Sequence, residues 1–275
     1  MINHHGDFIW YELMTTDADG ARDFYQKVVG WNIEATPSGP VDYRMITASE
    51  GNVAGLMPLT EEMAAGGARP CWVGYILVDD VDKMVESVEH GGGKVHMPAT
   101  TMGSVGRMAM VADAQGAAFY IMKPTPPTGQ PDATSNAFSY DKPRIGHCAW
   151  NELATSDPAA ALHFYGQRFG WVKDGEMDMG PMGKYEFLRH AGRAPDGSPP
   201  GQGMLGAVMP KVPEVPVSAW NYYFRVADID VAAKHIAANG GKVIHGPVEI
   251  PGGDYSLNGI DPQSAFFALV GARKG

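Results

Sequence analysis

The 275-residue sequence has little cysteine, no long apolar run and no segment that resembles a secretory signal. Its two cysteines, Cys71 and Cys148, are too few for a disulfide framework and lack the CxxC spacing of structural zinc sites. No apolar stretch approaches the roughly 20 residues that a membrane-spanning helix needs. The first residues lack the basic segment and apolar core of a signal peptide. These features predict a cytoplasmic protein with no membrane partner.

Clustered positive charge is also missing. The chain has 21 Lys and Arg against 31 Asp and Glu, a formal net charge of −10, and its basic residues are scattered singly. A nucleic-acid surface needs a dense patch of Lys and Arg, so we expect no nucleic-acid partner. Hydrophobic residues make up 44% and charged residues 19%, which is typical of a globular protein, and the length suits two domains.

An internal duplication dominates what is present. At a constant offset of 140 residues, Trp10, Glu12, Leu13, Asp17, Phe24, Tyr25, Gly30 and Trp31 recur as Trp150, Glu152, Leu153, Asp157, Phe164, Tyr165, Gly170 and Trp171. At an offset of 148, Trp72, Tyr75, Asp80 and Gly92 recur as Trp220, Tyr223, Asp228 and Gly240. Because the copies share order and spacing, a repeat architecture is the first prediction for the fold.

A proline-rich stretch separates the copies. Proline fixes φ and removes a backbone donor, so this stretch is predicted to be an extended linker. We therefore predict a first domain at 1–123, a linker at 124–144 and a second domain at 145–275. A second stretch rich in Pro and Gly, 191–203, interrupts the second half and is interpreted as an insertion and a candidate lid.

Each half reads as strand, helix and several strands, twice over. An aromatic strand is expected at 8–14, followed by a helix that Asp17 caps and Gly30 ends. A second helix is expected from Asp80 to the glycines 91–93. The remaining strands are predicted at 43–48, 53–59, 72–78, 95–97, 107–112 and 117–122.

Several short motifs occur in order in both halves. In the first half they are Phe24-Tyr25, Gly30-Trp31, Val78-Asp79-Asp80, Gly92-Gly93-Lys94 and Asp113-Ala114-Gln115-Gly116. With these motifs the chain resembles the vicinal oxygen chelate superfamily of glyoxalase I, extradiol dioxygenases and bleomycin-resistance proteins. The resemblance implies an α+β fold in which four βαβββ modules form two open eight-stranded barrels. The helices would lie outside, and each barrel would surround a cleft.

The resemblance also implies where a metal would bind. Metal-using members place His or Gln on the first strand of each module and a carboxylate on a late strand. In this sequence the first-strand positions fall on Trp10, Val73, Trp150 and Asn221, and the late positions fall near Tyr120 and Ala268. None of these side chains is a good ligand for a divalent cation. We therefore predict no metal cofactor, with a divalent metal at a site not identified as the alternative.

Side chains alternate along a strand, so Glu12 projects from the same face of its strand as Trp10, and Glu152 from the same face as Trp150. A glutamate beside an indole in an apolar cleft is expected to have a raised pKa, so Glu12 and Glu152 are candidate acid/base residues. The same alternation, with the late-strand position, gives the predicted ligand-binding residues Trp10, Tyr75, Tyr120, Trp150, Asn221, Tyr223 and Arg225.

Three functional hypotheses stay open at this point. The first is a protein that binds a small apolar or aromatic molecule in a metal-free cleft, as bleomycin-resistance relatives do. The second is a glyoxalase- or dioxygenase-family enzyme (a lyase, isomerase or hydroxylase) that uses Glu12 or Glu152, or an unidentified metal. The third has one binding half and one structural half. The alternative to all three is a purely structural role, in which the tryptophans pack in the core and the glutamates pair with Arg44, Arg225 or a backbone donor. The sequence leaves ligand identity and oligomeric state open.

Overall fold

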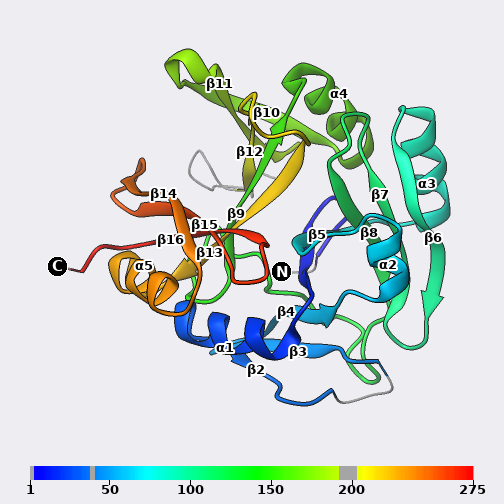
Figure 1. Cartoon of the computed structure of the whole chain (residues 1–275). Helices are drawn as coiled ribbons and strands as arrows, with labels where there is room; N and C mark the ends of the chain where they lie inside the picture. Colours follow the sequence, from blue (N-terminus) through cyan, green and yellow to red (C-terminus); the bar gives the residue numbers. More distant parts are fainter. Residues whose placement is uncertain (1–2, 38–40, 192–202, 275) are drawn as a thin grey trace. The chain divides into compact units, whose positions relative to one another are not determined.

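The structure is a computed structural model that describes residues 3–37, 41–191 and 203–274 (Figure 1). The first half contains β1 (Phe8–Thr15), α1 (Ala18–Val28), β2 (Asn32–Ile33), β3 (Arg44–Ala48), β4 (Gly51–Pro58), α2 (Glu61–Ala65), β5 (Cys71–Leu77), α3 (Val81–His90), β6 (Lys94–Met102), β7 (Gly106–Ala112) and β8 (Ala118–Pro124). The second half contains β9 (Cys148–Thr155), α4 (Pro158–Phe169), β10 (Trp171–Asp178), a short 3-10 turn (Gly180–Met182), β11 (Lys184–His190), β12 (Met204–Pro210), β13 (Ala219–Val226), α5 (Ile229–Ala238), β14 (Lys242–Glu249), β15 (Tyr255–Ile260) and β16 (Phe266–Gly271).

The strands form two eight-stranded mixed sheets with the same topology. Their orders are β2-β3-β4-β1-β5-β8-β7-β6 and β10-β11-β12-β9-β13-β16-β15-β14. In every module the first strand pairs in parallel with the last, and the remaining pairs are antiparallel. This is the pattern of a βαβββ unit used four times, so the predicted α+β fold class is confirmed.

Aspartates begin the main helices, as predicted for Asp17 and Asp80. The side chain of Asp17 accepts from the backbone N–H of Gly20, and Asp80 accepts from that of Lys83. Asp157 and Asp228 begin α4 and α5 in the same way. Helix α2 was not predicted from the sequence. It has only five residues and buries none of them, and a helix without an apolar face shows no hydrophobic periodicity.

Most of the predicted lid lies in residues 192–202, outside the described part of the chain. No helix of the described residues is long and apolar enough to cross a membrane.

The chain forms two compact units. Unit 1 comprises Met1–Ile9, Gly74–Ser135 and Trp150–Trp220, and unit 2 comprises Trp10–Val73, Asn136–Ala149 and Asn221–Gly275. Unit 1 thus combines most of the second and third modules, and α3 packs on α4. Unit 2 combines most of the first and fourth, and α1 packs on α5. The domain boundaries expected near residues 123 and 144 stay a prediction.

A buried Tyr–Asp–Trp network joins the two modules within each unit. In unit 2, the Tyr25 hydroxyl donates to Asp261 Oδ2 at 3.0 Å and accepts from Trp72 Nε1 at 3.0 Å. In unit 1, Tyr165 donates to Asp113 at 3.0 Å and accepts from Trp220 at 2.9 Å. The Phe-Tyr motif of one module therefore meets the aspartate turn of another.

Burial sets the protonation behaviour of these networks. It raises the pKa of the Asp113 and Asp261 carboxyls, although the turn N–H groups and the tyrosine hydroxyls partly oppose the shift. The pKa of Tyr25 lies well above its usual value, first because of burial and then because of the charge of Asp261. Tyr25 therefore remains a neutral hydrogen-bond donor at neutral pH.

Candidate ligand-binding site

The second half contains a hydrogen-bonded chain of three side chains, Trp150, Tyr185 and Glu152, which we call the second-half site. Trp150 Nε1 donates to the Tyr185 hydroxyl at 2.7 Å, and this hydroxyl donates to Glu152 Oε2 at 2.8 Å. Glu152 is 8% exposed, whereas Trp150 and Tyr185 are half-buried. A buried carboxylate is thus held next to two aromatic rings that solvent still reaches.

A third ring extends this aromatic surface. Phe187 is half-buried, and its centroid lies 6.2 Å from that of Trp150 and 5.7 Å from that of Tyr185, edge to face in both pairs. Tyr185 and Phe187 lie two residues apart on β11, so they project from the same face of the strand. The arrangement offers aromatic contact area beside a hydrogen-bonded carboxylate.

The equivalent residues of the first half, Trp10, Glu12 and Tyr43, form the first-half site. Trp10 Nε1 donates to the Tyr43 hydroxyl at 2.8 Å, and Glu12 is 3% exposed. Glu12 pairs in register with Gly55 on β4. A Cβ at Gly55 would lie 1.9 Å from the Tyr43 hydroxyl, so glycine is required for this hydroxyl to lie over the strand position opposite Glu12.

Cys71 lies within electrostatic range of Glu12. The pKa of the Cys71 thiol is raised to about 11, first by burial and second by the negative charge of Glu12. A thiol with this pKa stays protonated at neutral pH, which excludes it as a ready nucleophile.

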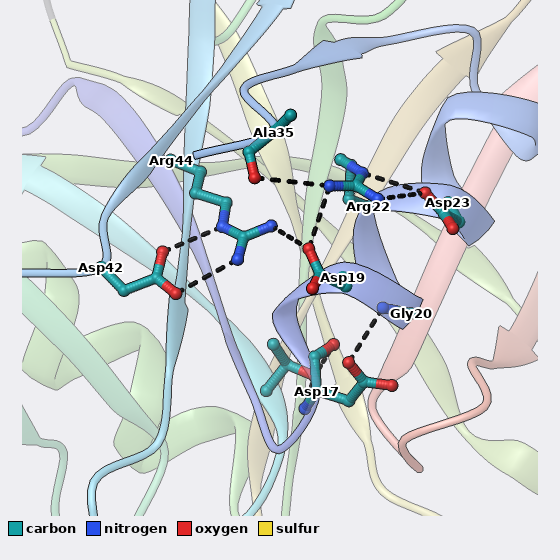
Figure 2. Close-up of polar contacts among 9 residues, drawn as sticks. Asp17, Asp19, Gly20, Arg22, Asp23, Ala35, Asp42 and Arg44 are labelled. Carbon is teal, nitrogen blue, oxygen red and sulfur yellow. Dashed lines mark hydrogen bonds and ion pairs between the residues drawn. The ribbon is translucent and has the colours of Figure 1, made fainter. Parts of the chain in front are cut away.

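Arg44, an expected partner for the glutamates, is engaged elsewhere (Figure 2). Its guanidinium binds Asp42 through two hydrogen bonds of 2.9 and 3.2 Å and Asp19 through one of 2.7 Å. Asp19 also binds Arg22, at 2.9 Å. These aspartates raise the pKa of Arg44 above its usual value, and Arg44 lowers that of Asp19. The network ties α1 to β3 and holds Arg44 beside Tyr43.

Arg225 is also paired with an aspartate. Its Nη1 lies 2.8 Å from Asp254 Oδ2. On the same strand, Asn221 and Tyr223 are half-buried like Arg225, and they alternate with the buried Tyr222 and Phe224. The predicted set Asn221, Tyr223 and Arg225 therefore shares one face of β13.

A row of side chains crosses the late strands of each half at equivalent positions. In unit 1, Tyr75 on β5 pairs with Tyr120 on β8, and Tyr120 pairs with Met110 on β7. The two tyrosine rings stack at 4.3 Å and 9° and are almost fully buried. This row is aromatic and apolar.

The matching row in unit 2 is polar. Tyr223 pairs with Ala268, and Ala268 pairs with Asn258. Ala268 is fully buried, and the amide of Asn258 donates to the Tyr223 hydroxyl at 3.3 Å. Alanine in place of the second tyrosine lets the polar groups on either side of it meet.

Comparison with known proteins decides the family. A model of the Glyoxalase/Bleomycin resistance protein/Dioxygenase superfamily matches residues 7–121 and again residues 144–263. The chain belongs to this superfamily. The tandem duplication expected from the sequence is thus confirmed as two copies of one family unit.

Relatives of this superfamily member cover almost its whole length. It is 35% identical over 263 residues to the Mycobacterium bovis protein named "Putative glyoxylase CFP32", covering 95% of this chain and 93% of that protein. It is 27% identical over 282 residues to "Anthracycline biosynthesis protein DnrV" of Streptomyces peucetius, covering 97% and 93%.

Solved structures share the fold at low identity. The Mn(II)-bound glyoxalase from Novosphingobium aromaticivorans has a TM-score of 0.61 and 16% identity, with 97% of this chain and 82% of that chain covered. The 2,3-dioxygenase LapB from Pseudomonas sp. KL28 has a TM-score of 0.62 and 12% identity, with 98% and 94% covered.

Four of the side chains at the expected metal positions of this superfamily member, Trp10, Trp150, Tyr120 and Ala268, do not suit a divalent cation. The Trp10 and Trp150 indoles donate their N–H groups to tyrosine hydroxyls, and an indole nitrogen cannot bind a metal because its lone pair is part of the aromatic system. Tyr120 is stacked on Tyr75, and Ala268 has no donor atom. Among the described residues, no group of three or more His, Cys, Asp and Glu side chains could hold a metal ion elsewhere.

The structure brings the predicted site residues into smaller sets. Trp150 and Glu152 meet through Tyr185, Trp10 meets Tyr43, and Tyr75 meets Tyr120. Tyr43 and Tyr185 were missed by the sequence reasoning. A signal for them existed in the sequence. A tyrosine, a charged residue and two apolar residues occur at 43–46 and again, at an offset of 142, at 185–188. The acid/base and ligand-binding roles remain predictions.

Proposed function

We propose that the protein binds a small aromatic molecule at its Trp–Tyr–Glu sites, without a metal, and that the carboxylate anchors a polar group of the ligand. The observation that carries the proposal is the hydrogen-bonded chain from Trp150 through Tyr185 to Glu152. Burying a carboxylate costs free energy unless hydrogen bonds compensate it. Tyr185 supplies one such hydrogen bond to Glu152 and so holds the carboxylate next to the aromatic rings.

The three half-buried rings of the second half favour an aromatic ligand. Stacked and edge-to-face ring pairs contribute about 0.5–1.5 kcal/mol beyond the area they bury. A cationic or hydroxyl group on such a ligand would find the Glu152 carboxylate nearby and would gain a charge-assisted hydrogen bond. The relative named for anthracycline biosynthesis points to the same class of compound, fused aromatic rings with polar substituents.

The second half is the better candidate of the two. It has Phe187 where the first half has Met45, so its aromatic surface is larger. In the first half, burial and the charge of Glu12 keep the neighbouring Cys71 thiol protonated.

An anthracycline that carries an amino sugar is a suitable probe. We expect saturable binding in isothermal titration, accompanied by quenching of tryptophan fluorescence. Glu152→Gln keeps the acceptor for Tyr185 but removes the charge. It should weaken binding roughly ten- to hundredfold, the equivalent of losing a charge-assisted hydrogen bond. Glu12→Gln is the matched control and should change the affinity less.

Elemental analysis of untagged protein prepared without chelator accompanies the titration. No saturable binding, or equal affinity in the wild type and both variants, contradicts the proposal. Stoichiometric manganese, iron, nickel, cobalt or zinc would mean that the sites work with a metal, and the glyoxalase or dioxygenase function would then replace it.

A second candidate function is metal-independent proton transfer. The Tyr185 hydroxyl and the Glu152 carboxylate share one hydrogen bond, and such a pair can pass a proton to or from a bound substrate. The relative named as a glyoxylase supports a reaction of this superfamily. Loss of turnover in Tyr185→Phe and Glu152→Gln with unchanged ligand affinity would favour the enzyme. Loss of affinity with no turnover to lose would favour the binding protein.

A further inference from the structure

A crevice lies between α3 and α4 in unit 1; it shares no lining residue with the Trp–Tyr–Glu sites and is independent of the proposed function. Its volume is about 670 Å³, within the range of small-molecule sites. Both helices contribute to its lining, which includes Lys83, His90, Gly91, His163, Gln167 and Arg168. None of the lining residues is an aspartate or a glutamate.

Arg168 is the buried charge of this crevice, with 9% of its surface exposed. Its Nε and Nη2 donate to the carbonyl of Ser87 at 3.1 and 2.6 Å, and its Nη1 donates to that of Phe164 at 3.0 Å. The guanidinium carbon lies 4.0 Å from the centroid of the Phe164 ring. Within the described part of the chain Arg168 forms no ion pair with a carboxylate.

The described residues provide no carboxylate as a counter-ion for this buried positive charge. Burial lowers the pKa of Arg168, although a guanidinium stays protonated in proteins. The carbonyls at the end of α3 compensate part of the charge. A guanidinium has five N–H donors and three are used by the bonds above, so two donors remain for a ligand.

The surrounding side chains add to the positive character. Lys83 and His90 on α3 and His163 on α4 are exposed at the crevice. At the start of α3, Lys83 Nζ lies 3.4 Å from Asp80 Oδ2. A cation and two imidazoles around a buried guanidinium suit an anion with more than one negative charge.

The duplicated helix pair shows that the fold does not require these cations. In α1 and α5 the positions equivalent to Arg168 and His163 are Val28 and Asp23. Lys83 and His90 correspond to Val231 and Ala238. That pair is joined instead by a hydrogen bond of 2.9 Å between Lys27 and Asn239 and one of 2.6 Å between His235 and the Lys27 carbonyl. The cationic set is therefore specific to the α3–α4 crevice.

The geometry points to a binding site for the phosphate group of a small phosphate monoester between α3 and α4. Arg168 receives two phosphate oxygens with its remaining donors, and Lys83 and His163 close the site from opposite helices. The space beyond the phosphate takes the rest of the molecule.

To test this, the protein is titrated at constant ionic strength with inorganic phosphate, with glycerol phosphate and with glycerol. Binding is measured by isothermal titration calorimetry and by the shift of the melting temperature. Both phosphates should bind saturably and raise the melting temperature, and glycerol should not. Tighter binding of the ester would identify the organic molecule as the ligand, and equal binding would identify free phosphate. No saturable binding of either overturns the site.

Variants locate the binding. Lys83→Gln and His163→Gln change exposed side chains, and each should weaken phosphate binding about fivefold. Arg168→Lys keeps the charge but loses the planar fork, so it should weaken binding about tenfold while circular dichroism stays that of the wild type. Lys234→Gln on α5, an exposed lysine outside the crevice, is the control. Equal loss in this control, or no loss in Lys83→Gln and His163→Gln, would show that the charge of the whole protein attracts the anion and would refute the site.

Discussion

The rows of side chains on the late strands differ between the two units more than the buried Tyr–Asp–Trp networks do. The row Tyr75–Tyr120–Met110 is apolar and stacked, whereas the row Tyr223–Ala268–Asn258 is polar and hydrogen-bonded. The buried Tyr–Asp–Trp networks, in contrast, use the same residue types with nearly the same distances in both units. The Tyr–Asp–Trp networks have thus stayed the same in both units while the two rows have changed, as expected if the two rows contact different groups.

Exchanging the residues at the centres of the two rows, Tyr120 and Ala268, should have the largest effect on the free energy of unfolding. Tyr120→Ala removes a ring that is stacked and buried, and we expect a loss of about 3–5 kcal/mol in the free energy of unfolding. Ala268→Tyr places a ring at a fully buried alanine, and overpacking should cost about 1–3 kcal/mol. Denaturant unfolding measures both. A cost below about 1 kcal/mol for Tyr120→Ala would show that the first row is an open ligand surface and not a packed one.

Removal of the tyrosine hydroxyls from the two networks should have a smaller and equal effect. In Tyr25→Phe the Trp72 N–H and an oxygen of Asp261 lose their partner while buried, which costs about 1–3 kcal/mol. Tyr165→Phe does the same to Trp220 and Asp113. Thermal and denaturant unfolding of both variants tests the equality. A difference larger than about 1 kcal/mol would mean that the two units do not depend equally on their networks.

The pH dependence of stability should be the smallest effect. Burial raises the pKa of Asp113 and Asp261 above 3.8 in the folded protein. The folded state therefore holds these protons to higher pH than the unfolded state. The resulting stabilisation is complete below about pH 3.8 and is lost as the pH rises through the raised pKa.

A variant isolates this contribution. Relative to Asp261→Asn, the wild type should lose stability as the pH is raised through this interval, and denaturant unfolding between pH 3.5 and 6 measures the difference. Asp132→Asn, at an exposed position, serves as the control for removal of a carboxylate. A wild type that gains stability relative to Asp261→Asn over the same interval would contradict the sign.

The sequence predicted the fold well because the repeat showed it twice. Asp17 and Asp80 identified helix starts, and alternation on β1 correctly put Tyr11 and Leu13 in the core. The candidate site was predicted only in part. Trp150 and Glu152 lie two residues apart on one strand, so side-chain alternation was enough to predict that they share a face. Tyr185 comes from another strand, and only the pairing of β11 with β12 and of β12 with β9 brings it there. The α3–α4 crevice left no sequence signal, because its cations are spread over two helices about 80 residues apart.

The two Tyr–Asp bonds also differ in how much chain they span. Tyr165 and Asp113 are 52 residues apart, whereas Tyr25 and Asp261 are 236 apart. By loop-closure entropy the longer contact costs about 1.3 kcal/mol more to form from an open chain. Every residue of unit 1 has been synthesised once the ribosome passes Trp220, but unit 2 requires the last strands of the chain. During translation, therefore, the middle of the polypeptide can fold first, while its beginning waits for its end.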